Sequence, residues 1–204
     1  MISVKVDSQE FPADISSVST MGDLIELVKA SIDPDSIIVD MQLGGQSLSE
    51  ADWRAPLNVH RNVLLEIKTG DKREYLLERL GVAEHYLAQI IDQFDTAGAN
   101  YRDGHAESAN TTLATAVDDL LAFVNWYLTL LSVEAVQLEP QIEEFNTHIN
   151  AIQQICEQLL QQQMFQSWWA LGETITARLT PQLQALKRFC EQTSEHAAKS
   201  LSAS

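Results

Sequence analysis

The sequence predicts an α+β protein in which a small β-rich domain precedes an antiparallel bundle of four helices. The spacing of apolar residues changes near Gly70, from every second residue before it to every third or fourth residue after it. The longest apolar run, Leu113 to Leu131, repeats at helical spacing and reads as the central helix of the bundle. A chain of 204 residues also has room for two small domains, each with its own core.

Alternating apolar and polar residues predict the strands of the first domain, residues 1–69. We expect strands at residues 2–6, 11–15, 37–43, 46–48 and 63–67, with a tight Gly-Gly turn before the fourth. Thr20 precedes Asp23 by three positions, which is typical of a capping box, so a helix is expected to begin there. This helix should end before Pro34.

This order of strands and helix resembles the ubiquitin-like β-grasp fold. The similarity covers residues 1–69 and is clearest in the stretch MQLGGQSLSEADWRAPLNVHRNVLLEIKTG. The resemblance implies a docking or scaffold module. Ubiquitin ends in a free diglycine, whereas this chain continues past Gly70, so conjugation is not expected. The aliphatic patch that ubiquitin offers its receptors corresponds to Gln42 and Glu66, which are polar, so recognition by such receptors is not expected either.

Helical spacing from Asp71 onward predicts an antiparallel bundle over residues 71–194. The four helices are expected at about 71–98, 104–135, 139–162 and 166–193, joined by short connections. Pro181 removes one backbone donor and should kink the fourth helix. Residues 195–204, rich in Ser, Ala and Lys, are predicted to be a disordered tail.

Each predicted helix carries one apolar seam that should face the core. The seam of the second helix passes through Leu113, Val117, Leu120 and Val124. The seams of the first and fourth helices comprise Leu76, Leu80, Ala83, Leu87, Ile90, Phe94 and Ala97, and Leu171, Ile175, Leu179, Leu183, Leu186 and Cys190.

The charge balance is strongly acidic. The chain has 13 Lys and Arg against 29 Asp and Glu, a net charge of −16, which argues against nucleic-acid binding through a basic face. No Lys or Arg occurs between Arg102 and Arg178, although acidic residues recur there. This stretch is interpreted either as a solvated acidic face or as a docking surface for a basic protein partner.

Several features bear on location and redox state. The start, MISVKVD, lacks the basic and apolar regions of a secretory signal, so a cytoplasmic location is expected. Asp118 and Asp119 interrupt the longest apolar run, so membrane insertion is not expected. Cys156 and Cys190 have neither CxxC nor metal-ligand spacing and are expected to be reduced core residues.

The sequence contains no motif that assigns an enzyme activity. Nucleophile-elbow, phosphate-loop, dinucleotide and zinc-protease patterns are missing, as is Glu-x-x-His. Glu144 and His148 could share a helix face, and His85 and His105 could complete a three-His site like that of metal-dependent DinB-like bundles. The alternative is that these are surface side chains flanking the seams. We therefore assign no catalytic residue, metal ligand or cofactor.

The candidate partner-binding residues are Met164, Phe165, Trp168 and Trp169. Adjacent tryptophans on a helix point about 100° apart, so both cannot face one narrow seam. One of them could be exposed beside Met164 and Phe165, residue types common at binding surfaces. The alternative is that both tryptophans cap the end of the bundle.

Three function hypotheses follow. The first is a non-enzymatic scaffold or adaptor that binds another protein. The second is a secretion- or assembly-type chaperone that binds a partner's helices, because the bundle and the run from Tyr101 through Gly104 to Asn110 weakly resemble flagellin-export chaperones. The third is a metal-dependent bundle enzyme. The identity of the partner and homo-oligomerisation stay open.

Overall fold

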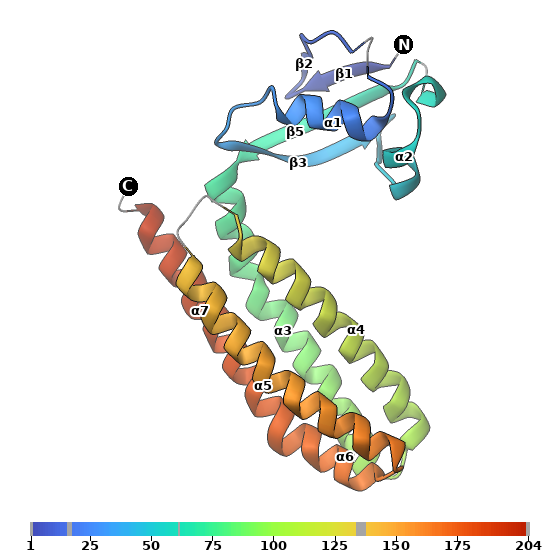
Figure 1. Ribbon diagram of the computed structural model, residues 1–204, viewed down its shortest axis with the longest axis vertical. Coiled ribbons are helices and arrows are strands. Elements are labelled where there is room, and N and C mark those ends of the chain that lie inside the picture. Colours follow the sequence, from blue (N-terminus) through green and yellow to red (C-terminus); the bar gives the residue numbers. More distant parts are fainter. Residues whose placement is uncertain (1, 16–17, 61, 134–137, 203–204) are drawn as a thin grey trace. The chain divides into compact units, whose positions relative to one another are not determined.

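A computed structural model describes residues 2–15, 18–60, 62–133 and 138–202 (Figure 1). The fold is α+β, with a mixed five-stranded sheet followed by helices. The chain separates into two compact units, Met1–Tyr75 and Leu76–Ser204, which we call the sheet unit and the helical unit. The boundary between them falls in the first turn of helix α3 (Lys72–Arg102).

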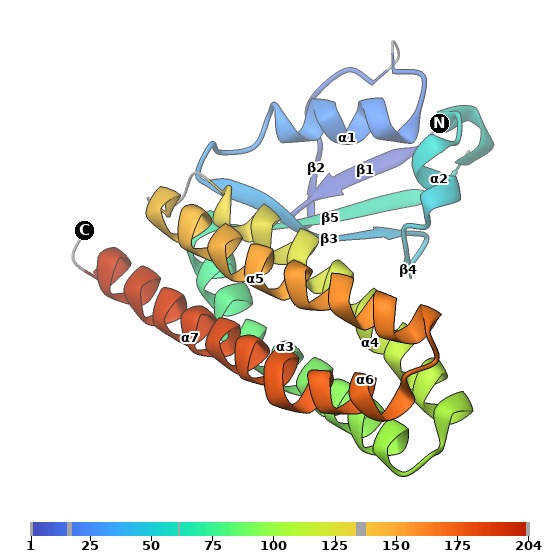
Figure 2. The same ribbon diagram turned by 60° about the horizontal axis from the view of Figure 1, so that its bottom comes forward.

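The sheet unit contains five strands and two short α-helices (Figure 2). The strand order is β2-β1-β5-β3-β4; β1 and β5 are parallel and the other neighbours antiparallel. The elements are β1 (Ser3–Val6), β2 (Gln9–Glu10), α1 (Met21–Lys29), β3 (Ser36–Leu43), β4 (Gln46–Ser47), α2 (Glu50–Arg54), the 3₁₀-helix η1 (Leu57–His60) and β5 (Leu64–Asp71).

Helix α1 supplies half of the sheet unit's core. The predicted capping box is confirmed: Asp23 N donates to Thr20 Oγ1 at 3.1 Å, and Thr20 N donates to Asp23 Oδ2 at 3.2 Å. One face of the helix is then buried against the sheet, as its apolar spacing requires. The core consists of Ile2, Val4, Met21, Leu24, Ile25, Val28, Leu65 and Ile67.

The predicted strand at 11–15 is wrong, because β2 ends at Glu10. Phe11 N still donates to Val4 O at 3.0 Å, but Pro12 has no amide hydrogen and ends the ladder. Strand β5 runs four residues past its predicted end, to Asp71, and Gly70 pairs with Ile37 of β3. The connection before β5 contains α2 and η1.

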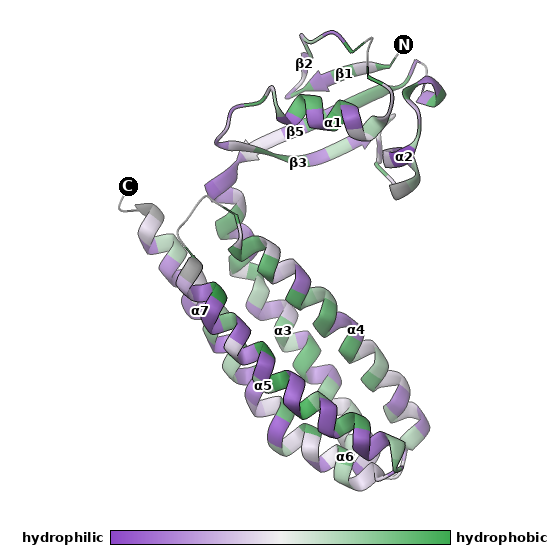
Figure 3. Cartoon of the chain, in the orientation of Figure 1, coloured by the Kyte–Doolittle hydropathy of each residue, from purple (hydrophilic) through white to green (hydrophobic). Residues whose placement is uncertain are grey.

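The helices of the helical unit lie side by side in both views (Figures 1 and 2). None of the described helices combines the length and apolarity needed to cross a membrane. Hydrophilic and hydrophobic residues are interleaved along each of them (Figure 3). The elements are α3, α4 (Ala106–Leu131), α5 (Glu139–Met164), α6 (Trp168–Thr174), the π-helix η2 (Ile175–Leu179) and α7 (Thr180–Ser202).

All of these elements contribute to one core cluster. Every residue of the predicted seams of the first and fourth helices is buried. The second seam is confirmed at Leu113 and Leu120, which are buried, but Ala116 and Phe123 are buried in place of Val117 and Val124, which are only partly buried. The Phe123 ring stacks on Tyr127, with centroids 5.5 Å apart. Because Ala116 and Phe123 each precede an expected valine by one residue while Leu113 and Leu120 stay buried, the buried face of α4 is turned by less than one residue.

The last helix departs from its predicted form at two places. Its π-helical turn, η2, ends two residues before Pro181, whose ring and missing donor disturb the preceding turn. The predicted disordered tail from residue 195 is instead helical to Ser202, because Ala197 is buried in the core and extends the packing by a turn. The predicted end of the second helix, residues 134–135, and residues 203–204 of the tail lie outside the described residues.

Candidate functional site

Large apolar side chains are exposed around the turn between α5 and α6. Their exposed fractions are 59% for Leu160, 73% for Met164, 80% for Phe165 and 65% for Trp169. Single exposed apolar residues are ordinary, but four within ten residues make this turn a candidate binding surface. We call these four residues the turn surface.

The backbone of this turn is fixed by hydrogen bonds. Helix α5 ends at Met164, and Gln166 takes a left-handed conformation with φ 53°. Ser167 N donates to Gln162 O at 2.8 Å, and Gln166 N donates to Gln163 O at 3.0 Å. These two bonds are those of a Schellman motif, which reverses the chain and lets α6 begin at Trp168.

The two tryptophans have different surroundings. Trp168 is half-buried and its ring stacks on Tyr101, with centroids 5.7 Å apart and planes 6° from parallel. Tyr101 Oη donates to Asn110 Oδ1 at 2.6 Å, and Gln163 Nε2 donates to the same oxygen at 3.1 Å. Asn110 therefore links α3, α4 and α5 beside the turn. Of the four candidate residues, Met164, Phe165 and Trp169 are exposed, and Trp168 packs against the core behind them.

A groove of about 410 Å³ runs between α4 and α5 and reaches the turn surface through Leu160. Its apolar walls include Leu113, Val117 and Leu159. Burial raises the pKa of the Cys156 thiol, so that this lining group is neutral at physiological pH. Asp118 is the carboxylate in the lining. We call this feature the α4–α5 groove.

The charges around the α4–α5 groove have one sign. Helices α4 and α5, which form its walls, contain no Lys or Arg. Asp118 on α4 and Glu157 on α5 are exposed, as are Glu143 and Glu144 nearer the start of α5. The groove is therefore apolar at its base and lies between two helices whose only charged side chains at neutral pH are acidic.

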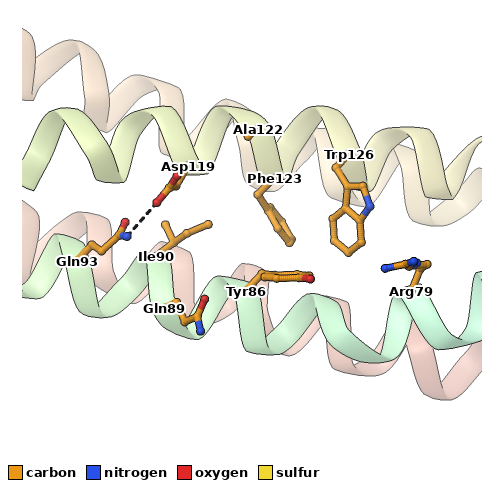
Figure 4. A pocket seen from close by; sticks show the side chains of 9 residues that line it. All are labelled: Arg79, Tyr86, Gln89, Ile90, Gln93, Asp119, Ala122, Phe123 and Trp126. Carbon is orange, nitrogen blue, oxygen red and sulfur yellow. Dashed lines mark hydrogen bonds between the residues drawn. The ribbon is translucent and has the colours of Figure 1, made fainter. Parts of the chain in front are cut away.

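A second pocket, of about 390 Å³, lies between α3 and α4 (Figure 4). Tyr86 meets Trp126 edge to face, with centroids 5.5 Å apart and planes at 87°, and the Phe123 ring lies 5.8 Å from Trp126. Gln93 and Asp119 lie at the other end, where Gln93 Nε2 donates to Asp119 Oδ2 at 2.9 Å. We call this feature the aromatic pocket.

The aromatic pocket was missed in the sequence. Tyr86 and Trp126 each lie outside the predicted seams, and helical spacing alone does not tell which residues of two helices meet. A possible signal was that both positions carry a large aromatic residue immediately beside a seam. The missing step was to know which faces of α3 and α4 meet.

The candidate metal ligands are not brought together. In the described part of the chain, no three His, Cys, Asp or Glu side chains are grouped so that they could hold a metal ion. His148 instead packs against Phe189, with ring centroids 5.5 Å apart, and His85 contacts Gln89 at 3.1 Å. The three-His arrangement considered from the sequence is thus not formed by these residues.

Comparisons with known proteins give one result. No curated protein and no solved structure matches the chain. A family model described as "Domain of unknown function (DUF8042)" matches residues 79–189, which is more than half of the chain. The matched range contains the turn surface, the α4–α5 groove and the aromatic pocket. The chain therefore belongs to this family, the DUF8042 domain proteins.

Proposed function

We propose that this protein is a non-enzymatic scaffold or adaptor whose helical unit binds a helical segment of another protein. The observation that carries the proposal is the turn surface, because its four large apolar side chains are exposed next to the apolar α4–α5 groove. Apolar anchors grouped at one place supply most of the binding energy of protein interfaces.

The shape of this surface favours an α-helix as the bound element. Leu160 and Met164 are four residues apart on α5 and therefore lie along one line of the helix surface. The groove between α4 and α5 continues this line toward Leu113 and Val117. An amphipathic helix fits such a groove by placing residues i, i+3, i+4 and i+7 against it.

The charge of the surface favours a basic partner. Since both walls of the groove lack Lys and Arg, the bound helix would carry Lys or Arg beside its apolar stripe. Association should then be faster at low ionic strength and weaken as salt is added, because exposed charges are screened within about 10 Å at 0.1 M salt.

We further infer the finer architecture of the two units. The strand order β2-β1-β5-β3-β4 with one parallel pair and the helix α1 supports a ubiquitin-like β-grasp fold for the sheet unit, which would act as a second docking module that is not conjugated. The shared core of α3, α4, α5 and the continuous α6-η2-α7 segment supports an antiparallel four-helix bundle.

The proposal can be tested on the full chain with a synthetic amphipathic helical peptide that carries Leu on one face and Lys on the other. Leu160→Ser and Phe165→Ser should each weaken binding about tenfold, because each removes an exposed anchor without opening the core. Isothermal titration calorimetry measures the affinity.

Matched controls distinguish specific binding at this surface from nonspecific hydrophobic or electrostatic binding. Val59→Ser removes an apolar side chain of the sheet unit whose exposed fraction, 67%, lies between those of Leu160 and Phe165, and it should leave the affinity unchanged. A peptide with Glu in place of Lys should bind much more weakly. Equal affinities for Phe165→Ser, Val59→Ser and the parent protein would remove the basis of the proposal.

A chaperone function differs in the state of the bound protein. The proposed groove would serve that function too, because it would hold a client's amphipathic helix before the client folds. A peptide corresponding to a helix of a natural partner, compared with the intact folded partner, distinguishes the two. Preference for the isolated or unfolded segment indicates a chaperone, and equal binding of the folded partner indicates an adaptor.

A further inference from the structure

The aromatic pocket is separate from the proposed partner-binding groove, because it lies on the other side of α4. Two adjacent residues of α4 line different features: Asp118 lines the α4–α5 groove and Asp119 lines the aromatic pocket. We propose that the aromatic pocket binds a small organic amine, specifically a protonated primary amine joined to an aromatic ring by a short chain.

The polar end of the pocket fits an ammonium group. Gln93 Nε2 donates to Asp119 Oδ2, and this bond fixes the orientation of the amide, since a reversed amide would place two acceptors against each other. Gln93 Oε1 is then a buried acceptor with no hydrogen-bond partner among the described residues. An ammonium has three donors, and at this end it can donate to the carboxylate of Asp119, which is exposed.

The apolar end of the pocket fits a flat ring. Tyr86 and Trp126 meet edge to face at 87°, and the pair forms an aromatic wall against which a bound ring can pack. Phe123 is about one helical turn from Asp119, and Trp126 is nearly two turns from it. Along the helix axis, these two aromatic residues therefore lie about 6 Å and about 10 Å from Asp119. A two-carbon chain between nitrogen and ring spans this separation.

The charges of the pocket give the ligand one orientation. Asp119 lies at one end, whereas the Arg79 guanidinium lies beyond Trp126 at the other (Figure 4). Like charges repel, so the ammonium should lie at the Asp119 end and the ring toward Trp126. The volume of about 390 Å³ is in the usual range for small-molecule sites.

Tryptamine is a suitable probe, with tryptophol and indole-3-propionate as neutral and anionic analogues. Binding to the full-length protein is measured by isothermal titration calorimetry. Tryptamine should bind saturably, at least tenfold more tightly than tryptophol. A preference for indole-3-propionate would mean that the Arg79 end recognises ligands and would overturn the proposal, as would the lack of saturable binding of tryptamine at millimolar concentration.

Two neighbouring variants provide the matched comparison. Asp119→Asn keeps the size of the side chain but removes its charge, and it should weaken tryptamine binding at least tenfold. Asp118→Asn makes the same change on the next residue, which lines the other groove, and should have no effect. Equal effects of the two variants would indicate only general attraction to an acidic protein.

A third variant tests the ring contact. Tyr86→Leu removes a wall of the pocket that is 44% exposed, so the fold should tolerate it, and tryptamine affinity should fall severalfold. Circular dichroism confirms that each variant is folded. Because the Lys-rich peptide should bind the Asp119→Asn variant normally, failure of this proposal is distinguishable from failure of the proposed protein-binding function.

Discussion

Asp7 joins the turn between β1 and β2 to strand β5. Asp7 and Ser8 both have positive φ, 49° and 69°, which is typical of a two-residue type I′ turn. Thr69 Oγ1 donates to Asp7 Oδ2 at 2.6 Å, and Thr69 N donates to Asp7 Oδ1 at 2.8 Å. These bonds hold the pKa of the Asp7 carboxyl below its ordinary value of 3.8.

Replacing Asp7 with Asn should lower the free energy of unfolding of the sheet unit by about 1 kcal/mol at pH 7, since the site is exposed and solvent weakens the charged bonds. Because the folded-state pKa is lowered, the stabilisation is complete above pH 3.8 and is lost as pH falls below it. Unfolding followed by the NMR signals of β5 amides should show the difference at pH 7 and lose it near pH 2. Equal differences at both pH values, or a similar loss for the exposed Glu10→Gln, would contradict this role.

The sequence did not show which of two neighbouring helical residues faces the core. Neighbouring residues on a helix point only about 100° apart, so the choice between Phe123 and Val124, or between Trp168 and Trp169, depends on partners elsewhere in the chain. At the α5–α6 turn, Trp168 is the inward residue because its ring stacks on Tyr101. The candidate region could be named from the sequence, but the inward and outward residues could not.

At the scale of elements, α3 and α6 approach each other closely at a pair of glycines. A Cβ added to Gly172 would lie 2.7 Å from the backbone oxygen of Gly98, nearer than real contacts allow. Gly81, also in α3, has space instead, because its nearest atom would be Ser194 Oγ at 4.0 Å. The same substitution should therefore have opposite effects at the two positions.

Gly172→Ala should lower the free energy of unfolding of the helical unit by about 2 kcal/mol, because the helices must move apart. Gly81→Ala should raise it by up to about 1 kcal/mol, because alanine favours the helix and meets no obstacle. Chemical denaturation followed by circular dichroism measures both. A neutral Gly172→Ala would show that α3 and α6 are not held at this distance.

Most elements could be predicted from periodicity, because each buries one continuous face. The long helices were found, as were β1, α1, β3 and β5. Their ends are displaced by up to about four residues, except that the last helix runs to Ser202 instead of 193. The predicted strand at 11–15 was wrong because apolar and polar residues continue to alternate there, although Pro12 ends the hydrogen bonding of the strand. The prediction of a disordered tail was wrong because it rested on the composition of the tail. It overlooked Ala197, whose small side chain continues the buried face of the helix.

At the scale of the whole molecule, the change of period near Gly70 indicated two parts, and the chain does separate into two units at Tyr75 and Leu76. The acidic stretch from 103 to 177 could be identified in the sequence, but the surface that it forms in the folded protein could not. The structure puts much of it on α4 and α5, the two walls of one groove. Both sites lie between consecutive helices, and spacing along one helix does not tell which of its residues face the next helix.

The central claim is that a basic amphipathic helix binds along α4, α5 and the turn surface. Amide hydrogen exchange of the full-length protein, with and without saturating Lys-rich peptide, tests the location directly. Added protection is expected in α4, in α5 and in the turn through Trp169, with the sheet unit unchanged. Protection confined to the sheet unit or to α3 and α7, with α4 and α5 exchanging as in the free protein, would contradict it.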